Sequence, residues 1–393
     1  MNKKLLIVRG HRLNKWEMQN YEPLKKYYDI KAVASYDHRF PLNEIEFPVK
    51  KLHSLRQIIG HLPKFRALFD LLTRNWPRRD YLLGLEKLMS TSDIVHTLET
   101  HAHYIFSYQA ALSKQKYRYR LVITHWENIP FAYEDMPNNR KIKSFVHRAA
   151  DHFLAITKRA KEALIIEGVP ENKISVVNYG IDLKRFFPKP KNERLMNDLE
   201  LRPDDLVILF IGRFVWEKGI FEILYALKKI IQDLAHSGLP NMKCLIVGSG
   251  EEKASLTEMI ARLNLTSEIR LLTDYPYQLI PEVHSLADIF IMPSVPLRHL
   301  REQYGMVIIE AMAMGKPIVS TYCGSIPEVV EDAGFLVPPA DHLALYQAIR
   351  HLIENPCARI EIGRKARLVA EQKYDAKKVS DKIHGIYQEI LSN

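Results

Sequence analysis

Short apolar runs rich in Ile, Leu and Val alternate with amphipathic stretches along almost the whole of this sequence. Runs of this kind, unbroken by polar residues, are typical of parallel strands that are buried on both faces. The stretches between them, such as Ile220–Leu234 and Glu251–Leu263, carry apolar residues at helical spacing. This repetition predicts an α/β protein with doubly wound parallel sheets. The expected strands are Leu5–Val8, Ile30–Ala34, Ile94–Thr97, Leu121–Thr124, Phe153–Ile156, Ile174–Val177, Val207–Ile211, Cys244–Val247, Ile269–Leu272, Ile289–Met292 and Ile318–Ser320.

The chain has 393 residues, which exceeds the size at which a single hydrophobic core stops growing, so we expect two domains. The prolines and charged residues of Phe187–Asn192 interrupt both periodicities, and this segment therefore predicts the boundary. The predicted domains are residues 1–187 and 188–374. Residues 375–393 follow them, with a helix over Lys377–Leu391.

The composition excludes several classes of protein. Hydrophobic residues make up 47% and charged residues 26%, which excludes disorder, collagen and coiled coil. The three cysteines have no short spacing, so a disulfide scaffold or a zinc site is not expected, and a reducing cytoplasm fits better. No apolar run is long enough to span a membrane, and the stretch Leu5–Val8 is too short for a signal peptide.

The net charge of +10 is unevenly distributed. Residues 1–190 contain 33 Lys and Arg against 19 Asp and Glu, a balance of +14, whereas residues 191–393 contain 23 against 27, a balance of −4. Much of the excess lies in Lys50–Lys87, where nine Lys and Arg stand against three acids and are interleaved with Leu, Ile and Phe. Such a stretch can lie on an anionic membrane surface. The alternative is an ordinary surface helix that packs its apolar face inward.

The strongest sign of chemistry follows the expected strand Val207–Ile211. The turn Gly212–Gly219 has a glycine at each end, which lets the backbone come close to a ligand, and it carries Arg213 and Lys218. The carboxyl end of a parallel strand faces the ligand crevice of such a sheet. Two cations beside a helix N-terminus suit a diphosphate in charge, donors and dipole. Taken alone, the pattern is better explained by two solvated surface cations.

A second pattern, Glu302–Met314, strengthens the interpretation as a binding site. From Met306 onward its residues are apolar on nearly every side, which predicts a buried helix with Glu310 in its middle. A buried carboxylate needs donors, and the hydroxyl groups of a ribose diol are candidates, the alternative being a buried ion pair. Glu302 lies just before the helix, beside amides that suit a phosphate, and its alternative is a solvent-facing acid.

These residues resemble the GT-B-fold retaining glycosyltransferases of family four. The hallmark of that family is a pair of glutamates in the pattern E-x-F-G-x-x-x-x-E-A-M-A, and Glu302–Ala313 follows it with Tyr304 in the phenylalanine position. The first domain departs from the family, because Arg9–Arg12 has one glycine where the family often has two. Flanking segments resemble the family as well, and the matches cover most of residues 150–340. They are Pro293-Ser294, Gly315–Ser320, Gly324–Val330, Ile174–Asp182 and Val247–Glu251.

The resemblance implies a GT-B fold, in which two Rossmann-like domains face each other across a cleft and the C-terminal helix crosses back to the first domain. It also implies roles for single residues. Arg213 and Lys218 would bind the donor diphosphate and neutralise it as it leaves, and Glu310 would hold the ribose hydroxyls. The transferred sugar and its distal phosphate would be met by Glu302 and by the backbone of Gly305, Met306 and Val307.

Two histidines lie at expected strands of the first domain: His125 directly after one strand and His96 within another. His125 follows Leu121–Thr124 and resembles the family's histidine that contacts the sugar near its reacting carbon. His96, within Ile94–Thr97, resembles a more common position of the family and is expected to be structural. The resemblance further implies retention of the anomeric configuration and a reaction without a cofactor or a required metal ion, and the sequence contains no Asp-x-Asp motif.

The resulting prediction is a cytoplasmic glycosyltransferase whose donor is a nucleotide-diphosphate sugar. It would dock on the inner face of the membrane through Lys50–Lys87 and glycosylate a glycan or a lipid-linked acceptor. The sequence has no recognised nucleic-acid motif, so a nucleic-acid partner is not expected. Two alternatives remain open. One is a nucleotide-sugar hydrolase or epimerase on the same scaffold, and the other is a non-enzymatic, basic membrane-binding protein with a vestigial donor site.

Overall fold

The computed structural model describes residues 2–54, 57–58, 81–99, 105–136, 138–234 and 241–392. The chain forms two compact units. Unit 1 consists of Met1–Gly180 and Ala376–Asn393, and unit 2 of Ile181–Asp375. The chain therefore leaves unit 1, builds the whole of unit 2 and then returns. The change of unit falls at Gly180, ahead of the proline-rich segment from which the sequence predicts the boundary.

Each unit is built on one parallel sheet. Within the described residues, unit 1 has seven strands in the order β3-β2-β1-β4-β5-β6-β7, and unit 2 has six in the order β10-β9-β8-β11-β12-β13. The strands of unit 1 are β1 (Lys3–Gly10), β2 (Tyr28–Ser35), β3 (Val49–Leu52), β4 (Ile94–Leu98), β5 (Arg120–His125), β6 (His152–Ala155) and β7 (Ile174–Val176). Those of unit 2 are β8 (Leu206–Ile211), β9 (Met242–Val247), β10 (Ile269–Leu272), β11 (Ile289–Met292), β12 (Ile318–Thr321) and β13 (Gly334–Val337).

The order of strands reverses beside the first strand of each sheet. β1 pairs with β2 on one side and with β4 on the other, and β8 pairs with β9 and with β11. At such a switch point the connections after the two central strands lead to helices on opposite faces of the sheet, which leaves a crevice in which doubly wound proteins bind their ligands. In unit 2 these two loops carry the residues singled out from the sequence, Arg213 and Lys218 after β8 and Glu302 after β11.

The fold class predicted from the sequence, two Rossmann-like doubly wound domains, is confirmed. The apolar runs miss two strands, β3 and β13, and both lie at an edge of their sheet. Lys50 and Lys51 are exposed on β3, and β13 is only half-buried over Gly334–Leu336. An edge strand is covered by fewer neighbours than a central one, and charged side chains there also hinder pairing with another chain. Such a strand therefore lacks the continuous apolar run that marks the buried strands.

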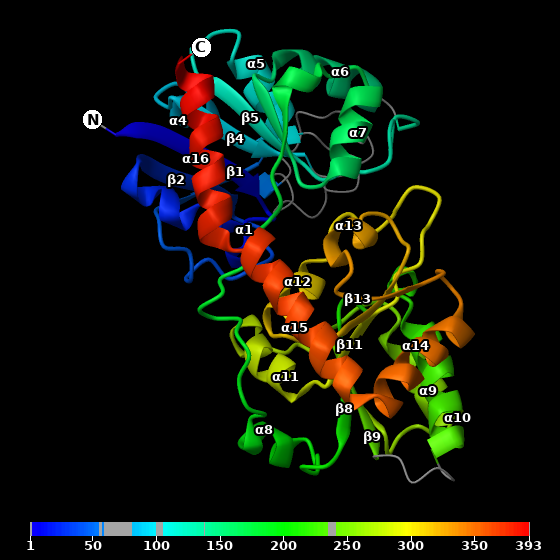
Figure 1. Ribbon diagram of the computed structural model, residues 1–393. Helices are drawn as coiled ribbons and strands as arrows, with labels where there is room; N and C mark the ends of the chain where they lie inside the picture. The colour runs from blue at the N-terminus through cyan, green and yellow to red at the C-terminus, as the bar shows by residue number, and fades with distance from the viewer. Residues whose placement is uncertain are drawn as a thin grey trace. The chain divides into compact units, whose positions relative to one another are not determined.

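Helices connect the strands of both sheets (Figure 1). The helix predicted over Ile220–Leu234 has those bounds in the structure, and the one predicted over Glu251–Leu263 is slightly shorter. In unit 1 the helices are α1 (Lys15–Met18), η1 (Glu22–Lys26), α4 (Leu85–Met89), α5 (Ile105–Ser113), α6 (Asn139–Ala149), α7 (Lys158–Ile166), η3 (Glu171–Lys173) and α16 (Ala376–Ser392). In unit 2 they are α8 (Glu193–Asp198), η4 (Trp216–Lys218), α9 (Ile220–Leu234), α10 (Lys253–Arg262), η5 (Tyr277–Leu279), α11 (Ile280–Leu286), α12 (Met306–Ala313), α13 (Ile326–Val330), α14 (His342–Glu354) and α15 (Pro356–Lys373).

The last helix, α16, completes the core of unit 1. It lies beside β1 and β2 in Figure 1, and one of its faces belongs to the same buried apolar cluster as these strands. Ile383 is 2% exposed and Tyr387 is fully buried. The hydroxyl of Tyr387 forms a hydrogen bond of 2.5 Å with Nδ1 of His96, on β4. The apolar positions of α16 recur at helical spacing, which is why the sequence predicts this helix over Lys377–Leu391.

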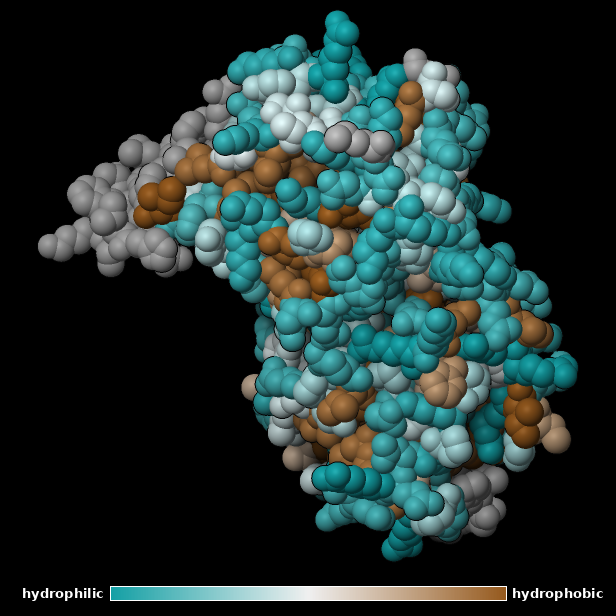
Figure 2. Space-filling view, turned by 90° about the vertical axis from the view of Figure 1, so that its left-hand side faces the viewer, coloured by the Kyte–Doolittle hydropathy of each residue, from teal (hydrophilic) through white to brown (hydrophobic). Residues whose placement is uncertain are grey.

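The basic segment Lys50–Lys87 falls largely outside the described residues. Its beginning forms the edge strand β3, and its end forms the start of α4. Among the described residues, none of the helices combines the length and the apolar character required to cross a membrane. On the face of the molecule in Figure 2, brown apolar areas are broken up by teal polar side chains wherever residues are described. The predicted membrane contact of Lys50–Lys87 therefore stays a prediction.

The packing of α16 can be tested by truncating one buried side chain. We expect Ile383→Ala to lower the free energy of unfolding of unit 1 by about 2–4 kcal/mol, because it leaves a cavity against the sheet. Urea unfolding followed by circular dichroism measures this change. Lys382→Ala, at the exposed neighbouring position, is the control and should leave the transition unchanged. Equal stability of the two variants would show that α16 contributes little to the core.

Candidate active site

The loops after β8 and β11 are in direct contact at the switch point of unit 2. Gly219 ends the turn after β8 with φ +67°, and a Cβ atom at this position would lie 2.0 Å from the carbonyl oxygen of Pro293. The amide of Val295 donates a hydrogen bond of 2.9 Å to the carbonyl of Glu217. No side chain fits at Gly219, so the glycine at this end of the turn allows the two loops to meet.

The side chains of Lys218 and Glu302 form an ion pair across these loops. The ammonium group lies 2.5 Å from Oε2 of Glu302, which also accepts a hydrogen bond of 2.9 Å from the hydroxyl of Ser294. The carbonyl of Glu302 accepts the amide of Ser325 at 2.8 Å, and Gly324 passes so close that a Cβ there would lie 2.1 Å from this carbonyl. Both the backbone and the side chain of Glu302 are therefore held in place.

Glu302 is an ionised carboxylate at neutral pH. Its burial alone would raise the pKa, but the charge and the hydrogen bond of Lys218, the hydroxyl of Ser294 and the charge of Arg213 outweigh burial and lower it. Arg213 is 65% exposed and forms an ion pair of 3.0 Å with Glu217. The carboxyl end of the sheet therefore presents two cations, the half-buried Lys218 and the exposed Arg213, next to the ionised carboxylate of Glu302.

The helix α12 begins beside Glu302. Gly305 forms its N-cap, and Tyr304 before it is fully buried. The amides of Met306 and Val307 belong to the first helical turn, where N–H groups have no acceptor within the helix. Together with the dipole of α12, such amides favour an anion.

Glu310 is buried in the middle of α12, at 3% exposure. Its Oε1 accepts a hydrogen bond of 3.0 Å from the hydroxyl of Tyr277, and its Oε2 lies 3.7 Å from Nε2 of His284. Burial lowers the pKa of His284 although Glu310 opposes the shift, so this imidazole is neutral at pH 7. The protein itself thus supplies part of the hydrogen bonding that the buried carboxylate requires. Neither Tyr277 nor His284 was singled out from the sequence.

His125 lies at the carboxyl end of β5 in unit 1, whereas Lys218, Glu302 and Glu310 belong to unit 2. The side chain is fully buried, and its Nδ1 is in direct contact with Oε2 of Glu99, whose amide donates to the carbonyl of Thr124 at 2.9 Å. Burial first, and then the charges of His147 and Lys143, lower the pKa of His125 well below its ordinary value. Because the imidazole is neutral at pH 7, it can exchange hydrogen bonds but cannot act as a cation.

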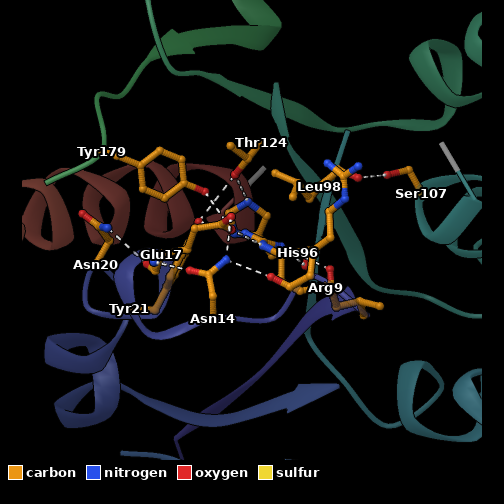
Figure 3. A network of polar contacts seen from close by, with 12 residues as sticks. Arg9, Asn14, Glu17, Asn20, Tyr21, His96, Leu98, Ser107, Thr124 and Tyr179 are labelled. Atoms are coloured by element: carbon orange, nitrogen blue, oxygen red, sulfur yellow. Dashed lines mark hydrogen bonds and ion pairs between the residues drawn. The ribbon is translucent and has the colours of Figure 1, made fainter. Parts of the chain in front are cut away.

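The loop after β1 is anchored by a buried network (Figure 3). Arg9 points into unit 1, where Nε donates to Oε2 of Glu17 at 3.1 Å and a terminal nitrogen donates to the hydroxyl of Tyr21 at 3.2 Å. The hydroxyl of Tyr179 lies 3.5 Å from the same oxygen of Glu17. His96 is buried beside them and bonds through Nε2 to the hydroxyl of Thr124 at 2.8 Å. The side chains of Arg9 and His96 are thus occupied by structural contacts.

Family models match both units. The model of the glycosyl transferases group 1 matches residues 191–369, and that of glycosyltransferase family 4 matches residues 32–185. The chain belongs to the family-four glycosyltransferases of the GT-B fold. It is similar to an uncharacterized glycosyltransferase of Methanocaldococcus jannaschii, at 23% identity over 84% of this chain and 82% of that protein.

This glycosyltransferase is also similar to a protein of Staphylococcus aureus and, in its fold, to a solved structure from Anabaena. The capsular polysaccharide biosynthesis glycosyltransferase CapM of Staphylococcus aureus is 30% identical over 62% of each chain, so the match spans less than two thirds of that protein. The structure of HepE from Anabaena, solved in complex with UDP and glucose, superimposes with a TM-score of 0.77. At 20% identity, with 99% of this chain and 100% of that chain covered, the likeness to HepE concerns the fold. Among the described residues, no group of three or more His, Cys, Asp or Glu could hold a metal ion.

The ion pair between Lys218 and Glu302 can be tested through its dependence on pH. We expect Lys218→Met to lower the free energy of unfolding at pH 7 by roughly 1–3 kcal/mol, because it leaves a largely buried carboxylate without its cation. The folded state lowers the pKa of Glu302. The pair therefore stabilises fully above the ordinary pKa of glutamate, and this contribution is lost as the pH falls through the lowered value.

Urea unfolding at pH 7 and at acidic pH measures the effect, with Glu302→Gln and the double variant completing a mutant cycle. The coupling energy should shrink towards acidic pH. A coupling energy that is close to zero at pH 7, or that does not change with pH, would contradict the assignment.

Proposed function

We propose that this glycosyltransferase takes a nucleotide-diphosphate sugar as donor, binds it at the switch point of unit 2 and transfers the sugar with retention of the anomeric configuration. The observation that carries the proposal is the pair of Lys218 and Glu302, held beside the first turn of α12. Charges of both signs at fixed positions suit a ligand that combines an anionic diphosphate with a polyhydroxylated sugar. The nucleotide in the solved structure of HepE supports the same class of donor.

Cleavage of the bond between sugar and phosphate develops negative charge on the phosphate and positive charge on the anomeric carbon. Lys218 and Arg213 would stabilise the leaving diphosphate, together with the amides of Met306 and Val307. Lys218 has three N–H donors, so it can keep Glu302 and still donate to a phosphate oxygen. Arg213 is exposed and would turn from Glu217 to the ligand. These groups neutralise the leaving group without a metal ion, and we propose that none is required.

The two glutamates would hold the two ends of the donor. Glu310 would accept the ribose hydroxyls, with Tyr277 fixing the carboxylate through its hydrogen bond to Oε1. Glu302 and the backbone of Gly305 would meet the transferred sugar. His125 would contact that sugar from unit 1 as a neutral imidazole, with Glu99 fixing the orientation of the ring.

Substitutions in the donor site should separate binding from chemistry. We expect Arg213→Gln to lower turnover by roughly 10²-fold, the scale for removing one electrostatic contact to a developing charge. Glu310→Gln should mainly weaken nucleotide binding, because its proposed partner is the ribose. The donor is identified first, by a screen of nucleotide sugars in thermal unfolding, since a tightly bound ligand stabilises the fold. Turnover and affinity are then measured with that donor in the presence of EDTA, which removes divalent metal ions.

Arg364→Gln, on the exposed face of α15, is the control for the arginine substitution and should retain full activity. Activity of Arg213→Gln within a factor of a few of the control would remove Arg213 from the site. Release of free sugar as the sole product, with every acceptor tried, would instead identify a hydrolase on the same scaffold.

We further propose that the acceptor is a glycan or a lipid-linked glycan, and that this cytoplasmic enzyme docks on the inner, anionic face of a membrane. The balance of +14 in residues 1–190 supports an anionic partner, because the donor site lies in the half with a balance of −4. The similarity to CapM, a protein of capsular polysaccharide biosynthesis, supports a glycan acceptor. Lys50–Lys87 would supply the contact, as each cation near such a surface contributes about 1 kcal/mol.

Membrane docking predicts a dependence on salt. The protein should co-sediment with vesicles that contain phosphatidylserine at low ionic strength, and binding should fall steeply as salt is added. Vesicles of phosphatidylcholine alone are the control. Equal binding to both kinds of vesicle, or none to either, would favour a soluble acceptor.

A further inference from the structure

A separate hollow of about 380 Å³ lies in unit 2 between helices α9 and α10 and the turn η4. It has the volume of a small-molecule pocket. None of the side chains assigned to the donor site lines it. The residues on which the argument rests are Trp216 from η4, Glu222 and Tyr225 from α9, and Ser255, Glu258 and Arg262 from α10.

Two of the aromatic side chains that line this hollow are open to solvent. Trp216 is 44% exposed and Tyr225 is 38% exposed. Both are amphipathic, with a large apolar ring and a polar group at one end, and neither is used to fill the core of unit 2. An exposed ring in a hollow offers a flat apolar surface to a ligand.

The charged side chains of the hollow are not paired with other described residues. Glu222, Glu258 and Arg262 make no side-chain hydrogen bond or ion pair with any residue that the structure describes, and Glu258 and Arg262 are exposed to solvent. Oε2 of Glu222 is out of contact with solvent and is still without a hydrogen bond. A covered carboxylate oxygen without a donor is unfavourable, and the hydroxyl group of a ligand would relieve it.

We propose that this hollow binds a neutral sugar residue of a glycan, at a site distinct from the donor site. A cation would use only the carboxylates, and an anion would use only Arg262 and Ser255. A sugar hydroxyl both donates and accepts, so a sugar uses the whole set, while the C–H groups of its ring cover the face of Trp216 or Tyr225. The inference goes beyond the proposed function and does not depend on it.

The position of Trp216 gives such a site a consequence for the turn after β8. Trp216 stands between Arg213 and Lys218 in the chain, and its carbonyl accepts the amide of Gly219 at 3.0 Å. A sugar bound against Trp216 would restrict the turn that carries both cations. The glycan and the donor diphosphate would then meet two faces of the same turn.

The experiment follows the nuclear magnetic resonance signal of Trp216. The chain has four tryptophans, and incorporation of 5-fluorotryptophan gives each a fluorine resonance, of which Trp216→Phe assigns one. The probes are the methyl α-D-glycosides of glucose, galactose and mannose. We expect the Trp216 resonance to move saturably with at least one of them, also in the presence of excess UDP. Tyr225→Ala and Glu258→Gln should each weaken the apparent affinity by about tenfold.

Phe187→Ala is the matched control, because Phe187 is an aromatic residue of the same unit with 42% exposure and does not line the hollow. It should bind the glycosides as the unsubstituted protein does. A Trp216 resonance that no glycoside moves would overturn the proposal, as would a movement that persists in both Tyr225→Ala and Glu258→Gln. Loss of the movement with UDP would place the sugar at the nucleotide site. A response to tetramethylammonium chloride alone would identify a cation site.

Discussion

The reversal of strand order beside β8 brings together residues that lie far apart in the chain. Lys218 and Glu302 are separated by 84 positions, yet they form an ion pair because their loops leave neighbouring carboxyl ends of the same sheet. The turn can approach only because Gly219 has no side chain. Every other part of the candidate site is placed relative to this contact. Arg213 shares the turn of Lys218, and the first turn of α12 follows directly after Glu302.

Much of this could be predicted from the sequence because the strongest signals are local. A continuous apolar run predicts a buried central strand, and the apolar residues on nearly every side of Glu310 predict the buried helix α12. The two loops of the switch point could be ranked as a site because their cations, glycines and acids stand in fixed short spacings. Where burial is partial, the same reasoning fails, and the edge strands β3 and β13 were missed for that reason.

The partners of buried polar groups could not be predicted, since they depend on contacts between distant segments. Tyr277 and His284 lie in η5 and α11, and only the packing of these helices against α12 brings them to Glu310. The pairing of Glu99 with His125 depends likewise on the register of β4 and β5. The turn also has a second face, on which Trp216 opens into a hollow that no local motif marks. The number of charged residues can be counted from the sequence, but the sequence does not show which neighbouring residue pairs with each buried charge.

The position of α16 in the chain bears on how the protein is made. Unit 2 is one continuous stretch, so a ribosome delivers all of it before the chain reaches Ala376. Unit 1 emerges first, but the part of its core that α16 covers stays exposed until this helix has been synthesised. The half that is synthesised first is therefore finished last, and it must wait through the synthesis of an entire second unit with apolar surface exposed. A cell that makes this protein has reason to shield the nascent N-terminal half with a chaperone during that interval.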